Sequence, residues 1–431
     1  MQSSTPSDLE RSVPESQRHS TASGAEMLAQ HIDPAVPSAT KARLHLPYLD
    51  GIRALMALYV VHNHLISAVR IPHTPFGWRP AELLQMFYQG HYSVAVFIVL
   101  SGYCLMLPVL RDNGTLRGGI ATFFKRRARR ILPPYYASLL GAAIIFAVAS
   151  RVVHHPVPEL TSWKRWALHL FLVHNFSWEH IYDYNGALWS IATEWQIYFL
   201  FPFLFLPIWK RFGEGALVAV ATALAAVLVL AFPSIAKGCP WFVILFAFGM
   251  IAARWSLQPA AWMKRIPWVW IGIVLVIGMY FVIRMFKLPD GKGGYYLPFE
   301  WFRIFAVKGQ IGWYQLTDII FGFATFCFLL HGTWATLEGR ASKFLAVLTW
   351  RPLVFVGAFS YSLYLIHMPV QNVVLKLVSH LGLSRPVLYG GMVVLYIPFA
   401  VLLAYGFYQL FEKPFLGAPK PKNPAVKPSS A

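Results

Sequence analysis

The stretch that decides the fold runs from Tyr48 to Arg70 and reads YLDGIRALMALYVVHNHLISAVR. It is long enough to cross a bilayer as one helix, because about 20 mainly apolar residues span the hydrocarbon core. Comparable apolar stretches recur to the end of the chain. The sequence therefore predicts an all-α protein, a polytopic transmembrane helical bundle.

The composition of the 431 residues agrees, because 57% are hydrophobic and only 13% are charged. Soluble domains are about 25% charged. The formal net charge of +19 would suggest nucleic acid in a soluble protein. In so apolar a chain it indicates basic loops on the anionic cytoplasmic leaflet. We expect contact with membrane lipids and no nucleic-acid partner, and the oligomeric state stays open.

The cysteines Cys104, Cys239 and Cys327 are too few and too scattered for a disulfide framework. They also show no metal-ligand spacing. The sequence also lacks a Walker A loop, an HExxH motif and a dinucleotide-binding glycine fingerprint in context. We therefore expect no metal and no nucleotide hydrolysis.

About ten spans are predicted along the chain. They lie approximately at 50–69, 91–110, 131–150, 188–208, 215–233, 238–254, 267–284, 316–333, 352–371 and 389–411. In this arrangement most lysines and arginines fall on the side that holds both termini. The positive-inside rule then places both termini in the cytoplasm, in a multi-pass integral protein of an endomembrane or the plasma membrane.

The chain divides into three parts by composition. Residues 1–45 are rich in Ser, Pro and Gln and have no apolar run, which predicts a disordered cytoplasmic tail. Residues 46–415 form the expected transmembrane domain. Residues 416–431 are rich in Pro and Lys and form a short cytoplasmic tail.

Ionisable residues in the first predicted span indicate a function, because such groups are costly inside a membrane. Arg53 and His64 are eleven positions apart, which returns them to within roughly 20° on one helix face. Asp50 lies near the same face, whereas His62 falls opposite Arg53. The pattern predicts one tunnel, with Arg53 near its cytoplasmic mouth and His64 deep in the membrane. In the alternative, Arg53 snorkels to lipid headgroups and His64 is a packing residue.

A polar stripe in the fourth predicted span contains Ser190, Glu194 and Tyr198, which recur every four residues. Glu194 is the only acidic residue well inside the middle spans. A buried carboxylate needs a partner, and we expect a histidine or arginine of the first span. A direct role in chemistry and a hydrogen-bonded packing contact are both open.

A second polar face lies in the ninth predicted span, FVGAFSYSLYLIHMPV. Ser360, Tyr364 and His367 share one helical face, with Tyr361 beside it. Such residues also hold transmembrane helices together, so packing is the alternative here.

A basic cluster at the start of the third predicted span reads FFKRRARRILPPYY. Its charged members are Lys125, Arg126, Arg127, Arg129 and Arg130. Topology and anionic lipid explain much of this charge. The cluster could also bind the phosphates of a cytoplasmic ligand such as coenzyme A through charge-assisted hydrogen bonds.

Together these segments resemble the acyltransferase 3 family of integral membrane acyltransferases, from Tyr48 to Phe415. Arg53 and His64 resemble the family's Arg-x10-His element, and FIVLSGYCL its Phe-x-Leu-Ser-Gly segment. RRARRILPPYY resembles its arginine-rich element and LWSIATEWQIYFLFP its Trp-Ser-x-x-x-Glu element. FSYSLYLIHMPV and FEKPF match its last two elements.

The resemblance implies transfer of an acyl group, often acetyl, from acyl-CoA or acetyl-CoA to a hydroxyl of a glycan, a lipid or a secondary metabolite. The expected catalytic residues are His64, as general base or acyl relay, with Glu194, Ser360 and Tyr361. The expected donor-binding residues are Arg53, Lys125, Arg126, Arg127, Arg129 and Arg130. The expected acceptor-binding residues are Ser190, Tyr198, Tyr364 and His367. His62 remains a rival for the role of His64.

A different class of protein also fits buried His, Glu and Arg in a multi-span bundle. A proton-coupled transporter or a flippase of a lipid-linked substrate would use the same polar stripe as a proton relay. A non-catalytic membrane scaffold would leave the buried charges unexplained. Consumption of acyl-CoA distinguishes the enzyme from both.

Overall fold

The computed structural model describes residues 45–69, 90–153, 162–285, 311–340 and 342–417. Within these ranges all regular structure is helical, which confirms the all-α prediction. Almost all of the predicted tails at 1–45 and 416–431 lies outside the described residues. The proposed domain boundaries stay predictions.

The described residues form a series of helices along the chain. They are α2 (Pro47–Val69), α4 (His91–Arg111), α5 (Gly119–Val153), α7 (Trp163–Leu170), α8 (Leu188–Leu200), α9 (Leu206–Ala231), α10 (Phe242–Leu257), α11 (Trp268–Met285), α12 (Ile311–Leu337), α13 (Lys343–Leu348), α14 (Arg351–Gly357), α15 (Ser360–Val378), α16 (Arg385–Gly391) and α17 (Ile397–Phe407). Short 3-10 or π segments are η4 (His174–Phe176), η5 (Phe201–Phe205), η6 (Pro233–Gly238), η7 (Met263–Arg265), η9 (Ser379–Leu381), η10 (Met392–Tyr396), η11 (Tyr408–Glu412) and η12 (Lys413–Phe415).

The predicted count of about ten spans is not confirmed. Six helical runs among the described residues are long and apolar enough to cross a membrane, or up to seven if the bent pair α14 and α15 forms one span. The predicted spans 188–208 and 215–233 join into one run, Leu188–Ala231, which is interrupted where Gly213 takes a φ of 80°. The apolar parts of α10 and α11 are shorter than the other runs. Hydropathy thus located the helices but not the number of crossings.

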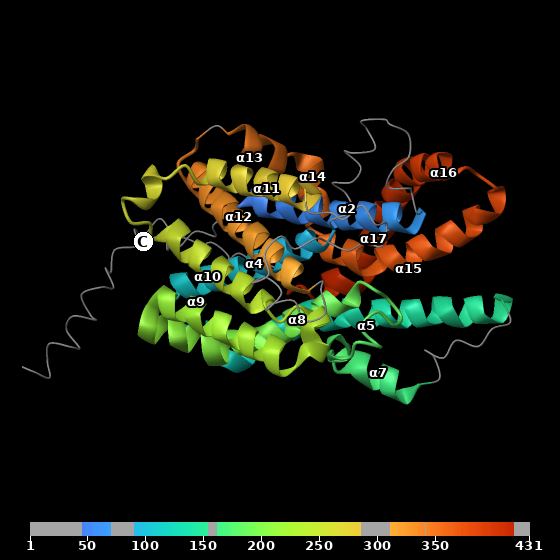
Figure 1. Ribbon diagram of the computed structural model, residues 1–431, viewed down its shortest axis with the longest axis horizontal. Coiled ribbons are helices and arrows are strands. Elements are labelled where there is room, and N and C mark those ends of the chain that lie inside the picture. The colour runs from blue at the N-terminus through green and yellow to red at the C-terminus, as the bar shows by residue number, and fades with distance from the viewer. Residues whose placement is uncertain (1–44, 70–89, 154–161, 286–310, 341, 418–431) are drawn as a thin grey trace, which may run out of the picture. The chain divides into compact units, whose positions relative to one another are not determined.

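The helix α4 lies at the centre of the bundle, where it packs against α2, α10 and α12 (Figure 1). The backbones of α4 and α10 approach very closely. A Cβ on Gly249 would lie 2.0 Å from the Val99 carbonyl oxygen, and one on Gly102 would lie 2.2 Å from that of Phe246. Small residues permit such contact between helices in a membrane.

Replacing Gly249 with alanine is therefore expected to destabilise the fold. Overpacking costs about 1–3 kcal/mol, and here the obstacle is backbone that no rotamer change can relieve. The measurement is the thermal unfolding midpoint in detergent, which should fall. Gly278→Ala on α11 is the matched control, because a Cβ there meets nothing within 4 Å. Equal midpoints for the two variants would contradict the close approach.

A sharp break separates α14 from α15, whose axes differ by 74°. Gly357 ends α14 against the first helix, where a Cβ would lie 2.0 Å from the Asp50 carbonyl oxygen. The next helix then begins at Ser360. The break places the start of α15 inside the bundle, beside the pocket described below.

Candidate active site

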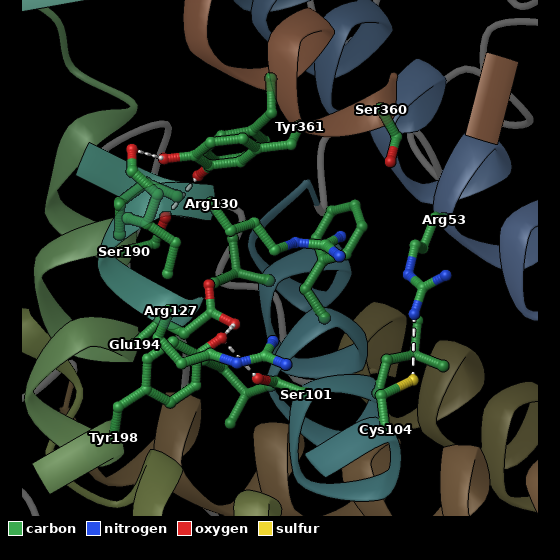
Figure 2. Close-up of a pocket in the computed structure, with 17 residues that line it drawn as sticks. Arg53, Ser101, Cys104, Arg127, Arg130, Ser190, Glu194, Tyr198, Ser360 and Tyr361 are labelled. Carbon is green, nitrogen blue, oxygen red and sulfur yellow. Dashed lines mark hydrogen bonds between the residues drawn. The ribbon is translucent and has the colours of Figure 1, made fainter. Parts of the chain in front are cut away.

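A pocket of about 130 Å³ opens among α2, α4, α5, α8 and α15 (Figure 2). Five helices from distant parts of the sequence supply its walls. Its polar lining consists of Arg53, Ser101, Cys104, Arg127, Arg130, Ser190, Glu194, Tyr198, Ser360, Tyr361 and Tyr364. The sequence predicted nine of these eleven residues as site residues and missed Ser101 and Cys104.

Three arginines converge on the pocket. Arg53 is held in place on both sides of its guanidinium group. Its Nη1 pairs with Asp50, and its Nη2 donates to Cys104 Sγ at 3.0 Å. Arg127 and Arg130 enter from α5 (Figure 2). The pocket therefore concentrates positive charge where an anionic ligand could bind.

The structure divides the basic cluster of α5 into two groups. Arg127, which is partly buried, and Arg130, which is exposed, both line the pocket, whereas Lys125, Arg126 and Arg129 do not. Arg126 donates instead to the Arg117 carbonyl oxygen. Residues three apart share a helix face, so Arg127 and Arg130 can line the pocket together. Two of the five residues predicted to bind the donor therefore line this pocket, and the binding role itself stays a prediction.

The carboxylate of Glu194 is held on its own helix. Tyr198, one turn further on, donates its hydroxyl to Glu194 Oε1 at 2.5 Å, and Ser101 Oγ lies 2.9 Å from the same hydroxyl. Arg127 lines the same pocket from α5. We expected a histidine or arginine of the first span as the partner of Glu194, but the hydrogen bond comes from Tyr198 on the same helix. The nearby positive charge is that of Arg127 on α5.

Two pairs of hydroxyls in the pocket differ in their partners. Ser190 Oγ and the Tyr364 hydroxyl share a hydrogen bond of 2.7 Å across α8 and α15. Ser360 donates to the Gly357 carbonyl oxygen at 3.0 Å, and Tyr361 donates to that of Ile131 at 3.1 Å. Ser190 Oγ also donates to the Ala187 carbonyl oxygen, at 3.3 Å. Ser190 and Tyr364 thus join two helices inside the pocket, whereas the hydroxyls of Ser360 and Tyr361 bond to backbone carbonyl oxygens.

His64 does not line the pocket, but a series of ring contacts connects the two. Its ring packs edge-on against that of His367, with the centroids 5.1 Å apart. His367 in turn contacts the ring of Tyr364, at 5.7 Å. His367 Nδ1 donates to the Tyr364 carbonyl oxygen, which leaves Nε2 as the acceptor nitrogen of a neutral ring. Arg53 therefore lines the pocket and His64 does not, and His367 and Tyr364 lie between His64 and the pocket.

His62, the other histidine of the first predicted span, faces a different helix from His64. His62 Nε2 lies 2.6 Å from the hydroxyl of Tyr389 in α16. His64 instead meets α15, where Gln371 also donates to its carbonyl oxygen at 3.0 Å. This arrangement follows from helix phase, and it places His64 on the side of the bundle where Tyr364 reaches the pocket.

Helix periodicity could have predicted Ser101 and Cys104 as pocket residues. They are three residues apart on α4, and with Phe97 they form one face of the segment FIVLSGYCL. Cys104 was considered only as a disulfide or metal-binding residue. Its role here is to accept a hydrogen bond from Arg53.

These features define a helical membrane protein with an arginine-lined pocket inside its bundle, and the comparison with known families identifies its class. The chain matches the acyltransferase domain of the acyltransferase 3 family over residues 46–408. This match covers most of the chain, so the protein belongs to that family. The resemblance first seen in the motifs is confirmed.

Three of the relatives are bacterial proteins. The putative peptidoglycan O-acetyltransferase YrhL of Bacillus subtilis is 28% identical over 200 residues, which is 43% of this chain and 28% of that protein. The peptidoglycan O-acetyltransferase OatA of Listeria monocytogenes is 23% identical over 360 residues, and the O-acetyltransferase OatA of Staphylococcus aureus strain NCTC 8325 is 25% identical over 362. Each of these two matches covers 76% of this chain and 50% of the relative. The chain thus spans half or less of the length of these relatives. No solved structure matches it.

Proposed function

We propose that this protein is a membrane-embedded O-acyltransferase that moves an acyl group, often acetyl, from acyl-CoA to a hydroxyl group. One observation carries the proposal: three arginines and a network of hydroxyls meet in one pocket of a bundle that belongs to the acyltransferase 3 family. Both termini would then lie in the cytoplasm, so that Arg127 and Arg130 face the compartment that holds the donor.

The donor would bind through its phosphates. Guanidinium groups match phosphate geometry with two parallel hydrogen bonds, and such charge-assisted bonds are stronger than neutral ones. Arg53, Arg127 and Arg130 supply three of them around one opening. The thioester end of the donor would reach toward Ser190 and Tyr364, at the part of the pocket that leads to His367.

The reaction then needs a base and a site for negative charge. The acceptor oxygen attacks the thioester carbonyl carbon while His64 takes its proton, directly or through His367. The hydroxyls of Ser190 and Tyr364 stabilise the oxyanion that forms. The carbon–sulfur bond breaks, and CoA leaves as a thiolate that takes up the proton. Tyr198 holds Glu194 in the same pocket, and Ser101 is hydrogen-bonded to Tyr198 in turn.

A sugar hydroxyl of a glycan is the first acceptor to consider. The Bacillus and Listeria relatives are named as peptidoglycan O-acetyltransferases. A lipid hydroxyl and a secondary metabolite are the other two acceptor classes. All three leave the donor chemistry unchanged.

Acyl-CoA consumption by the purified protein tests the proposal. The full chain in liposomes is given acetyl-CoA labelled in the acetyl group, together with peptidoglycan fragments, hydroxylated lipids or small hydroxylated metabolites in turn. We expect free CoA to be released and the label to form an ester with one class of acceptor. The control is the same reaction without an acceptor.

One outcome would favour the transporter instead. If acetyl-CoA stays intact with every acceptor class while a substrate or protons cross the liposome membrane, the polar residues serve transport and the proposal is wrong. Hydrolysis of acetyl-CoA without an esterified product would also contradict transfer.

A further inference from the structure

A second cluster of chemically reactive side chains lies outside the pocket. His91 is the first residue of α4, Cys239 lies between η6 and α10, and Asp318 belongs to α12. One donor atom from each lies within 4.8 Å of the others. They meet because α4, α10 and α12 pack against one another.

The carboxylate of Asp318 is the most unusual member. Its side chain is fully buried, with 0% exposure. Oδ2 accepts hydrogen bonds at 2.8 Å from both His91 Nε2 and Trp241 Nε1. Oδ1 is buried and finds no hydrogen-bond partner among the residues that the structure describes. A buried charge with an unsatisfied oxygen is costly unless a cation compensates it.

The other two donors suit a soft or borderline metal ion. Cys239 is buried, and its backbone adopts the left-handed conformation, with a φ of 54°, which an L-residue seldom takes. This turn holds its thiol near Asp318. His91 is partly exposed, with its side chain at 24%, and its ring stacks on that of Trp189 at 5.9 Å. Sulfur, imidazole nitrogen and carboxylate oxygen together favour zinc over magnesium or calcium.

We propose that His91, Cys239 and Asp318 bind one zinc ion. Donors at about 2.0–2.3 Å from a tetrahedral zinc lie roughly 3–4 Å apart, so small side-chain movements would complete the site. Trp241 donates to the carboxylate and fixes its orientation, as outer hydrogen bonds do at zinc sites. Three protein ligands leave a fourth position, which water can reach beside the partly exposed His91.

The cysteine spacing could not reveal this site, because each donor comes from a different segment of the chain. Zinc here would join segments at three helices. Trp189 stacks on His91 and is followed in the sequence by Ser190, which lines the pocket. The zinc site goes beyond acyl transfer and does not depend on it.

Metal content tests the proposal. The full chain is purified in detergent, its affinity tag is removed, and it is incubated with excess zinc and desalted. Elemental analysis should then find about one zinc per chain in the wild type. Cys239→Ser and Asp318→Asn should each lose most of it. Cys327→Ser is the matched control, because it removes another buried cysteine, which lies on the same helix as Asp318 but outside the cluster, and it should keep the metal.

A spectroscopic measurement identifies the ligand. Cobalt(II) in place of zinc should give a thiolate-to-cobalt charge-transfer band in the wild type and in Cys327→Ser, and none in Cys239→Ser. Thermal unfolding controls for folding: zinc should raise the midpoint of the chelator-treated wild type and leave that of Cys239→Ser unchanged.

Two results would overturn the site. A wild type that keeps no zinc after incubation would show that the cluster is a hydrogen-bonded packing contact. Zinc retained equally by Cys239→Ser and Asp318→Asn would show that the metal binds elsewhere. Neither result concerns acyl transfer, and a failure of acyl transfer would leave the metal content unchanged.

Discussion

His64→Ala is expected to lower acyl transfer by about 10²- to 10⁴-fold, the range that a positioned general base contributes. The imidazole is linked to the pocket through His367 and Tyr364, and its removal leaves the acceptor hydroxyl without a base. Expression and donor binding should stay near those of the wild type, because His64 does not line the pocket. The measurement is the rate of CoA release at saturating acetyl-CoA.

His62→Ala is the control for this experiment. It removes the same side chain two residues away, where the ring contacts Tyr389 rather than α15. Its transfer rate should stay within about threefold of the wild type, because only the loss of the general base itself lowers the rate by about 10²-fold or more. Transfer that persists in His64→Ala while His62→Ala is inactive would assign the base to His62.

Arg127→Ala is expected to weaken binding of acyl-CoA by about 10- to 100-fold. Hydrogen bonds to charged groups contribute about 1.5–3 kcal/mol, and each 1.4 kcal/mol is about tenfold in Kd. The guanidinium lines the pocket beside Arg130, so its loss should act on the phosphates of the donor. Isothermal titration of the purified protein with acetyl-CoA measures the effect.

Arg129→Ala is the matched control, because it removes an arginine of the same cluster that is exposed and lies outside the pocket. Its Kd should change by less than about threefold, as expected of an exposed charge. Equal losses in both variants would mean that the cluster acts by general charge on the membrane surface. Arg53→Ala should behave like Arg127→Ala, and an unchanged Kd there would remove Arg53 from the donor site.

Much of the fold was predictable because hydropathy depends on local sequence. The helices follow the apolar stretches. The number of membrane crossings could not be predicted from hydropathy. It depends on bends such as that at Gly213 and on whether short helices traverse the bilayer. Neither property is encoded in a run of apolar residues.

The sequence predicted most residues of the candidate site, but few of the contacts between them. Helix phase correctly separated His62 from His64, and the same argument applied to Arg127 and Arg130 would have separated them from Arg129. The contact between His64 and His367 could not be predicted, because it joins α2 to α15 across most of the sequence. Asp318 was overlooked because it lies near one end of its predicted span, where an exposed carboxylate is unremarkable.

The break between α14 and α15 has an electrostatic consequence for the pocket. The peptide dipoles of a helix sum to about half a positive charge at its N-terminus. Ser360 and Tyr361, the first residues of α15, line the pocket, so this partial charge adds to that of the three arginines. An interrupted helix thus contributes a fixed field inside the bilayer, where water and salt screen it less than at a surface. We therefore expect the backbone, as well as the side chains, to favour the proposed anionic donor over a neutral thioester.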